Sequence, residues 1–340
     1  MQFQLPINIK SPEARITYRD KILLTGSCFT EHIGNSLSEV KFSTLQNPHG
    51  ILFDPRSVCS SLISYVEHKK YKKEDLFLLN EVWNSWEHHS RFSNINADQA
   101  LKTINESQQQ AYHFLKDADW LIITLGSSFS YRLTSEFSKV SPPNVGGDLE
   151  GAGVANCHRA PSQWFNKHLL SIDESIALLD GAYHRLKQFN DKLRIIFTIS
   201  PVRHIRDGVI ENNRSKARLI EAVHYMVNKY PGLCYFPAYE LVIDVLRDYR
   251  FYDIDMVHPN YPATEFVMEK FNESFIDEQS QQLMEEIKKI VIARKHKPFQ
   301  PETSAHRTFL KNNLEKAKEL QSKFPFLDLS EEINYFIQTE

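Results

Sequence analysis

The chain has 340 residues, of which 41% are hydrophobic and 24% charged, with a formal net charge of −3. This length supports a large buried core, in one large domain or two modest ones. The charge balance gives no basic surface for nucleic acid, and no apolar run approaches the ~20 residues that span a bilayer.

The N-terminal segment MQFQLPINIK has neither the charged start nor the apolar core of a signal peptide, so we expect a cytoplasmic protein without a membrane partner. The four cysteines, at positions 28, 59, 157 and 234, lie far apart, and no CxxC pair occurs. This spacing argues against a disulfide framework.

The first strong pattern is KILLTGSCFTE at residues 21–31. A short apolar run ends at Gly26, and from Phe29 onward apolar residues recur at helical spacing, which predicts a strand, a tight turn and a helix. The turn carries two potential nucleophiles, Ser27 and Cys28. At a helix N-terminus the dipole and free N–H groups favour an anion, so a lowered thiol pKa is expected there. The alternative is an ordinary buried cysteine.

Further core strands are predicted at 42–46, 119–125, 193–199 and 233–236, with helices at 97–117, 171–186, 214–230 and 261–276. The strands at 119–125 and 193–199 are continuous apolar runs, which are typical of parallel strands covered on both faces. Alternating strands and helices predict an α/β fold with a parallel sheet. Because sites in such sheets lie at the carboxyl ends of the strands, Cys28 and Gly126 are expected to share one edge.

Two stretches interrupt this pattern, at 71–96 and 127–160, and the second is long enough for a functional loop or lid. We therefore predict an α/β domain over 1–276 with these two insertions. Amphipathic patterns at 277–295 and 303–323 predict a helical extension over 277–340. It is expected to pack on the domain or on a second subunit, as in a homodimer.

A late motif, FYDIDMVHPN, places Asp255 three residues before His258. Histidine is the usual general base, and a neighbouring carboxylate can hold its tautomer and stabilise the imidazolium. Such a spacing is common by chance. Together with an early strand, glycine turn and nucleophile, it becomes a much more specific signal.

These motifs resemble the GSCFA family, whose name corresponds here to Gly26-Ser27-Cys28-Phe29-Thr30, with Thr in the last place. The resemblance covers roughly residues 20–275 and includes NPHGILFDP, TLGSS, NCHRAP and TISPVRH. The family is similar to the SGNH/GDSL hydrolases. That similarity implies a flavodoxin-like three-layer α/β/α sandwich with strand order 2-1-3-4-5, followed here by a C-terminal helical appendage.

The resemblance also implies roles for single residues. In a gap-free register Cys28 takes the place of the nucleophilic serine, whereas a turn shifted by one residue would give that role to Ser27. Asp255 and His258 match the late DxxH of the family. Gly50 matches the glycine whose N–H helps to form the oxyanion hole.

Gly126 matches the third block of the family, where Ser128 stands in place of the usual asparagine. Asn156 is a candidate for the missing amide donor. His89 and His158 are candidates for the pocket wall, and Arg203 could clamp a carboxylate or phosphate or form a surface ion pair.

The expected function is that of an esterase or acyltransferase on a small-molecule or acylated-carbohydrate substrate, without cofactor or metal. The carbohydrate is inferred from the fold relatives alone. Two alternatives remain open at this stage. One is a non-catalytic binding module on the same fold, which the missing asparagine favours, and the other is a metal enzyme using Cys157, His158 and His89.

Overall fold

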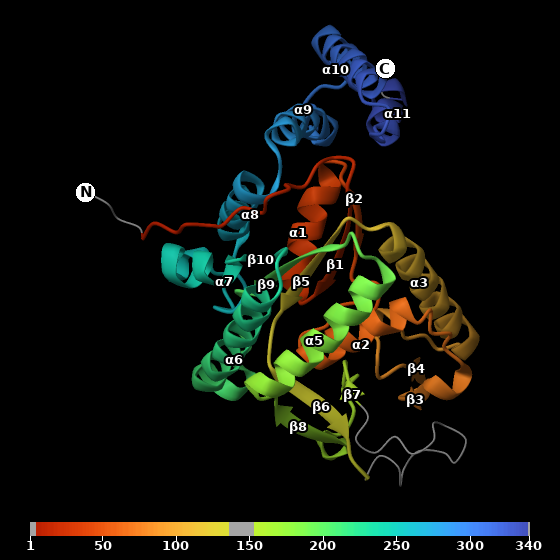
Figure 1. The fold of residues 1–340 in the computed structure, drawn as a ribbon. Helices are drawn as coiled ribbons and strands as arrows, with labels where there is room; N and C mark the ends of the chain where they lie inside the picture. The colour runs from red at the N-terminus through yellow and green to blue at the C-terminus, as the bar shows by residue number, and fades with distance from the viewer. Residues whose placement is uncertain (1–4, 136–152, 339–340) are drawn as a thin grey trace.

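A computed structural model describes residues 5–135 and 153–338. Its centre is a five-stranded parallel sheet, drawn in Figure 1, in which neighbouring strands follow the order β10-β9-β5-β1-β2. The strands are β1 (Lys21–Gly26), β2 (Ser43–Gln46), β5 (Trp120–Leu125), β9 (Arg194–Ile199) and β10 (Leu233–Phe236). The predicted α/β fold with a central parallel sheet is confirmed, and each core strand begins within one residue of its predicted position.

Two hydrophobic cores lie on the two faces of this sheet, because successive strand side chains point in opposite directions. In β1, Ile22 and Leu24 face one core and Leu23 the other, and all three are fully buried. The first core includes side chains of α1 (Cys28–Glu39) and α8 (Tyr261–Phe275). The second includes α2 (Pro55–Val66), α3 (Ala97–Asp117), α5 (Ile172–Phe189) and α6 (Gly208–Lys229).

The register of the sheet brings three strand ends to one edge. Gly26 of β1 pairs with Thr124 of β5, which in turn pairs with Thr198 of β9. The residues that follow these strands therefore lie next to one another. We call this edge the carboxyl rim, defined by Ser27, Gly126 and Ser200 after the three strands.

Both interruptions contain antiparallel strands that the periodicity did not predict. Within 71–96, β3 (Phe77–Leu79) and β4 (Val82–Asn84) form a hairpin. The second interruption contributes β6 (Phe129–Leu133) and β7 (Gly153–Val154), which join β8 (Phe165–Leu169) in a three-stranded sheet. The central part of the expected lid, 136–152, lies outside the described residues.

The C-terminal extension contains α9 (Glu278–Lys295), α10 (Ser304–Lys323) and α11 (Ser330–Gln338). It packs near the amino end of the sheet, where Phe326 contacts Tyr18 and the buried Glu332 pairs with Lys41. Figure 1 shows these helices on the far side of the molecule from β6 and β8. The extension is therefore remote from the carboxyl rim.

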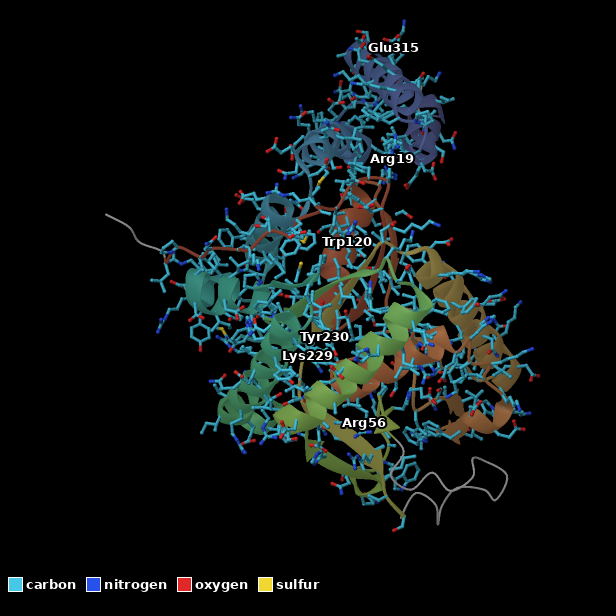
Figure 2. The ribbon with its side chains drawn as sticks, in the orientation of Figure 1. Arg19, Arg56, Trp120, Lys229, Tyr230 and Glu315 are labelled. Atoms are coloured by element: carbon cyan, nitrogen blue, oxygen red, sulfur yellow. The ribbon has the colours of Figure 1, made fainter. Side chains whose placement is uncertain are left out.

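Figure 2 labels Trp120 and Arg56, which lie toward opposite ends of the molecule. Trp120, the first residue of β5, lies toward the C-terminal helices, while Arg56 at the start of α2 lies toward β6 and β7. Among the described helices, none combines the length and apolarity required to cross a bilayer.

Candidate functional site

The turn after β1 sets the positions of the two candidate nucleophiles. Gly26 adopts φ +139°, and a Cβ there would lie 2.1 Å from the Thr124 carbonyl oxygen, so only glycine fits. Ser27 is the N-cap residue of α1, and Cys28 is the first residue of that helix. Ser27 is 1% exposed and its hydroxyl has no hydrogen-bond partner, whereas Cys28 is half-buried. Of the two, the Cys28 side chain is the more accessible.

The electrostatic surroundings of Cys28 act in opposite directions. Burial raises the pKa of the Cys28 thiol, and it outweighs the lowering by the Lys216 charge and by the backbone N–H groups of Phe29 and Cys28. The net pKa is therefore raised, and the expectation of a lowered thiol pKa is corrected. The helix N-terminus does favour the thiolate here, but the desolvation of a half-buried sulfur is larger.

Asp255 and His258 form the hydrogen-bonded pair that their spacing predicts. Asp255 Oδ2 lies 2.6 Å from His258 Nδ1, while Oδ1 accepts the backbone N–H groups of Val257 and His258. These hydrogen bonds hold the pKa of the Asp255 carboxyl down at about 2. Because Nδ1 is engaged by the carboxylate, Nε2 is the ring nitrogen left to exchange protons with a substrate.

His258 also lies near α1. Its charge, together with burial, lowers the pKa of His32, which is one helical turn beyond Cys28. The His258 side chain is 46% exposed, and it makes no hydrogen bond to Ser27 or Cys28. The site thus contains the thiol and the His–Asp pair near the same helix, without a hydrogen bond between sulfur and imidazole.

Arg203 braces the loop that carries the His–Asp pair. Its backbone N–H donates to the Val257 carbonyl, and its guanidinium donates to the Met256 carbonyl at 3.1 Å. The guanidinium also lies 4.1 Å from the centre of the Tyr252 ring. These contacts position the loop, while the role of Arg203 as an anion clamp stays a prediction.

Gly50 lies in a tight turn that engages its N–H group. The Gly50 N–H donates to the Asn47 carbonyl at 2.7 Å, and a Cβ at Gly50 would lie 2.1 Å from the Cβ of His89. The expected oxyanion donor is therefore hydrogen-bonded within its own turn. In this conformation it is not available to a substrate.

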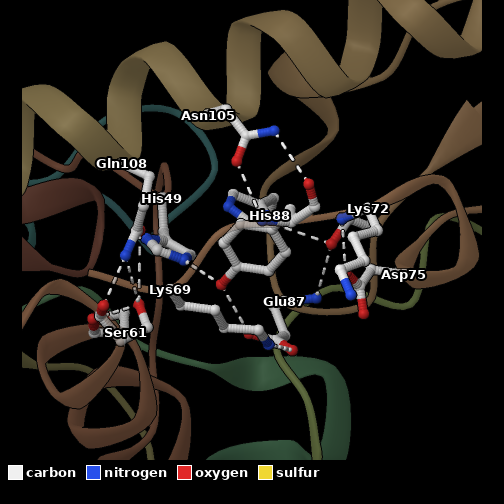
Figure 3. Close-up of polar contacts among 12 residues, drawn as sticks. His49, Ser61, Lys69, Lys72, Asp75, Glu87, His88, Asn105 and Gln108 are labelled. Atoms are coloured by element: carbon white, nitrogen blue, oxygen red, sulfur yellow. Dashed lines mark hydrogen bonds and ion pairs between the residues drawn. The ribbon is translucent and has the colours of Figure 1, made fainter. Parts of the chain in front are cut away.

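A buried polar network surrounds His49, the residue before Gly50, and Figure 3 shows polar contacts in this region. His49 bonds the hydroxyl of Tyr65 at 2.8 Å and that of Tyr71 at 3.0 Å, and its ring stacks on His88. Tyr71 in turn donates to Glu87. Burial lowers the pKa of His49 to about 3, so the imidazole is neutral at physiological pH. The network therefore holds His49 through hydrogen bonds to both of its ring nitrogens.

Gly126 reaches the rim, but the side chain of Ser128 does not. The Gly126 N–H donates to the Phe53 carbonyl at 2.8 Å, and its Cα lies against Ser27. Ser128 is fully buried, and both its N–H and its hydroxyl bond to Ser215 of α6. The expectation that Ser128 could replace the oxyanion asparagine is therefore corrected, because its hydroxyl is directed to the helix.

Asn156 and His158 form a local turn near the first insertion. Asn156 Oδ1 accepts the His158 N–H at 2.9 Å, and His158 Nε2 lies 2.8 Å from the Ser85 carbonyl. Among the described residues no partner engages the Asn156 Nδ2 group, so it stays available as a donor. His89, the third member of this group, is close enough for its charge to lower the pKa of His158.

The residues proposed for a metal enzyme have other partners. His158 bonds a backbone carbonyl, and the Cys157 thiol has a pKa raised to about 11 by burial, which opposes the thiolate a metal needs. Within residues 5–135 and 153–338, no three His, Cys, Asp or Glu side chains are grouped to hold a metal ion.

Two residues of the site were not predicted from the sequence. Lys216 of α6 is 1% exposed, and its amine donates to the carbonyls of Gly126 and Ser200, each at 2.6 Å. His32 lies beside His258. A signal for Lys216 exists, because it occupies the apolar stripe of α6 that continues through Leu219. A lysine on such a stripe is an exception that requires an explanation.

The family model described as the GSCFA family matches residues 21–271, and the model described as the GSCFA domain protein, C-terminal domain, matches residues 287–339. No curated protein matches the chain.

Proposed function

Because the chain belongs to the GSCFA family, we propose that it is an SGNH-like esterase or acyltransferase with Cys28 as its nucleophile. One arrangement carries this proposal. A half-buried thiol opens α1 at the carboxyl rim, while Asp255 fixes His258 near the same helix with Nε2 free. The SGNH similarity is further supported by a nucleophile after the first strand and a DxxH before α8.

The proposed reaction has two halves. The Cys28 thiolate attacks the acyl carbon, a C–S bond forms, and the carbonyl oxygen becomes an oxyanion. His258, protonated at Nε2, gives this proton to the leaving alcohol oxygen as the C–O bond breaks. Water or an acceptor alcohol then attacks the thioester while His258 takes its proton. The C–S bond breaks, and His258 returns this proton to the departing thiolate, which regenerates the thiol.

The oxyanion requires fixed donors about 3 Å from its position. We assign this role to the backbone N–H groups at the start of α1 and to the Asn156 amide. Asn156 is preferred because the Gly50 N–H and the Ser128 hydroxyl are engaged elsewhere. The N–H groups of Cys28 and Phe29 already face the thiol sulfur.

The proposed substrate is a small acyl ester, with an acylated carbohydrate as the preferred class. We further propose a cytoplasmic location, which the four free cysteines support. A homodimer through α9–α11 is part of the same proposal. It is compatible with catalysis, since these helices lie away from the rim.

Covalent capture tests the proposal directly. The full chain is mixed with p-nitrophenyl acetate, quenched in acid and weighed by mass spectrometry. An acetyl adduct on the Cys28 peptide is expected in the native protein and in Ser27→Ala, and none in Cys28→Ala. Capture that survives in Cys28→Ala and disappears in Ser27→Ala would transfer the role to Ser27.

A non-catalytic binding module is the second candidate, and the engaged Gly50 N–H favours it. It predicts no adduct in any variant, with saturable binding of an acetylated sugar measured by calorimetry. Turnover of the same sugar ester would exclude this candidate.

A further inference from the structure

Lys216 lies behind the turn that carries Cys28. Its amine bridges the carbonyl oxygens of Gly126 and Ser200, which follow β5 and β9, at 2.6 Å each. The Gly126 backbone packs directly against the turn, because a Cβ there would lie 3.2 Å from the Cβ of Ser27. The amine is therefore held at the carboxyl rim, bound to a residue that packs against the turn of Ser27 and Cys28.

Among the described residues, no carboxylate neutralises the buried amine of Lys216. Lys216 is 1% exposed, and no carboxylate of the described chain forms an ion pair with it. An ammonium has three N–H donors, and only two are engaged. A buried unpaired charge is costly, so a lysine in this place either loses its proton or is stabilised by a nearby anion.

Among the described residues, Cys28 is the one acidic group whose charge favours the charged form of Lys216. The effect is mutual, because the lysine charge also lowers the pKa of the Cys28 thiol. Burial nevertheless lowers the pKa of Lys216 to about 7. A negative sulfur beside it would keep the amine protonated.

We propose that Lys216 is the charge partner of Cys28, stabilising first the thiolate and then the oxyanion through space. This inference rests on the proposed function, in which Cys28 is the nucleophile. Lys216 does not exchange a proton directly with Cys28, because its amine donates to two carbonyls and forms no hydrogen bond with the sulfur. The thiol proton leaves to His258 or to water. Lys216 is thus a positioning residue that acts on the charge of Cys28.

Other charges face the same groups. Glu31, on α1, opposes Lys216 by raising the pKa of Cys28. The charge of Lys216 contributes to lowering the pKa of His204. The centre of the Tyr239 ring lies 5.9 Å from the Lys216 amine. Glu31→Gln should therefore shift the thiol ionisation in the opposite direction to a loss of Lys216.

The test is the pH profile of Cys28 alkylation by iodoacetamide in the full chain, followed on the Cys28 peptide by mass spectrometry. Lys216→Gln removes the charge and keeps two N–H donors for the carbonyls, and Lys216→Met removes both. Each should move the profile up by about one pH unit, so that labelling at pH 7 slows roughly tenfold. Lys229→Met, on the same helix but paired with Asp180, is the matched control and should not move it.

If folded Lys216→Gln has the native pH profile of Cys28 alkylation, Lys216 only links the Gly126 and Ser200 carbonyls, and the inference is overturned. If neither Lys216 variant folds, the shape of the alkylation pH profile of the native protein tests the inference. A lysine that loses its charge in the same pH range must flatten the rise below one log unit per pH unit, and a single simple ionisation curve would refute the coupling. A shifted pH profile without acyl capture would support the Lys216–Cys28 charge pair and reject the proposed esterase function. Acyl capture with an unshifted pH profile would support the esterase function and reject the charge pair.

Discussion

Asp255 holds His258 through two different groups, with Oδ2 on the Nδ1 atom of the ring and Oδ1 on the backbone N–H. One carboxylate therefore fixes both the tautomer of the imidazole and the turn that carries it. Both contacts are possible because the two residues are three apart in a tight loop. Arg203, which follows β9, donates a hydrogen bond to the Met256 carbonyl of this loop.

Asp255→Asn should lower kcat/KM for p-nitrophenyl acetate by about 100-fold or more, within the ~10²–10⁴ that a positioned acid–base group supplies. Asparagine can present its N–H₂ to Nδ1 and so stabilise the wrong tautomer. Asp253→Asn is the matched control on the same loop and should retain activity. Equal losses in both variants would show that the loop, and not the pair, is required.

Cys28 should be alkylated by iodoacetamide at neutral pH before Cys59, Cys157 and Cys234. All four thiols have raised pKa values through burial, but only Cys28 is also favoured by helix N–H groups and a buried lysine. Peptide mass spectrometry over a time course gives the order. Faster labelling of Cys157 or Cys234 would make Cys28 a packing residue.

Asn156→Ala should lower kcat by about 10²–10³ with little change in KM, as expected for loss of one oxyanion donor. Ser128→Ala should instead lower the melting temperature and leave kcat near its native value, since the Ser128 hydroxyl binds Ser215. Steady-state kinetics and thermal denaturation of both variants separate the two roles. A large kcat loss in Ser128→Ala would contradict this assignment.

Gly50→Ala should destabilise the fold by about 1–3 kcal/mol. Its φ of +82° disfavours any Cβ, and that Cβ would lie 2.1 Å from the Cβ of His89. Adding His89→Gly should recover part of the loss by removing the clash while the backbone strain persists. Urea denaturation of the single and double variants measures the cost of the steric clash and the cost of the backbone strain. Full recovery in the double variant would show that backbone strain at Gly50 is negligible.

Glu332→Ala should destabilise the packing of the C-terminal helices by about 1–3 kcal/mol, because it removes the buried partner of Lys41 and Arg294 and leaves them only the exposed Glu331. Glu331→Ala is the neighbouring control, since the Glu331 side chain is 63% exposed and its ion pairs are worth little. Limited proteolysis and thermal denaturation report the difference. Esterase activity should survive mild destabilisation, as these helices lie away from the rim.

Much of the fold was predictable because its signals are local. The five core strands appear as short apolar runs, and the helix over 97–117 has its predicted bounds. The antiparallel strands of the two insertions were missed, because they have only two to five residues each and half-buried positions that follow no clear alternation. β3 and β4 pair as neighbours in sequence, whereas the pairing of β6 with β7 and β8 joins segments distant in the chain.

The candidate site divides in the same way. The spacing of Asp255 and His258 was enough to predict their hydrogen bond, since residues three apart in a turn are neighbours in any fold. Ser128 and Gly50 were assigned by position in motifs, but a motif does not report whether a group is already engaged. Ser128 bonds a residue 87 positions later, and no local pattern indicates such a contact.

By itself the sequence determined the parallel α/β sheet, the turn at Ser27 and Cys28, and the His–Asp pair, because each depends on residues within one strand, turn or loop. Only the tertiary structure decided that Ser27 is buried while Cys28 is half-exposed, and that Lys216 lies behind them. Lys216 reaches the carbonyl of Gly126 across 90 positions of sequence. That contact exists because the sheet register aligns three strand ends and α6 packs over them, and both result from the whole fold.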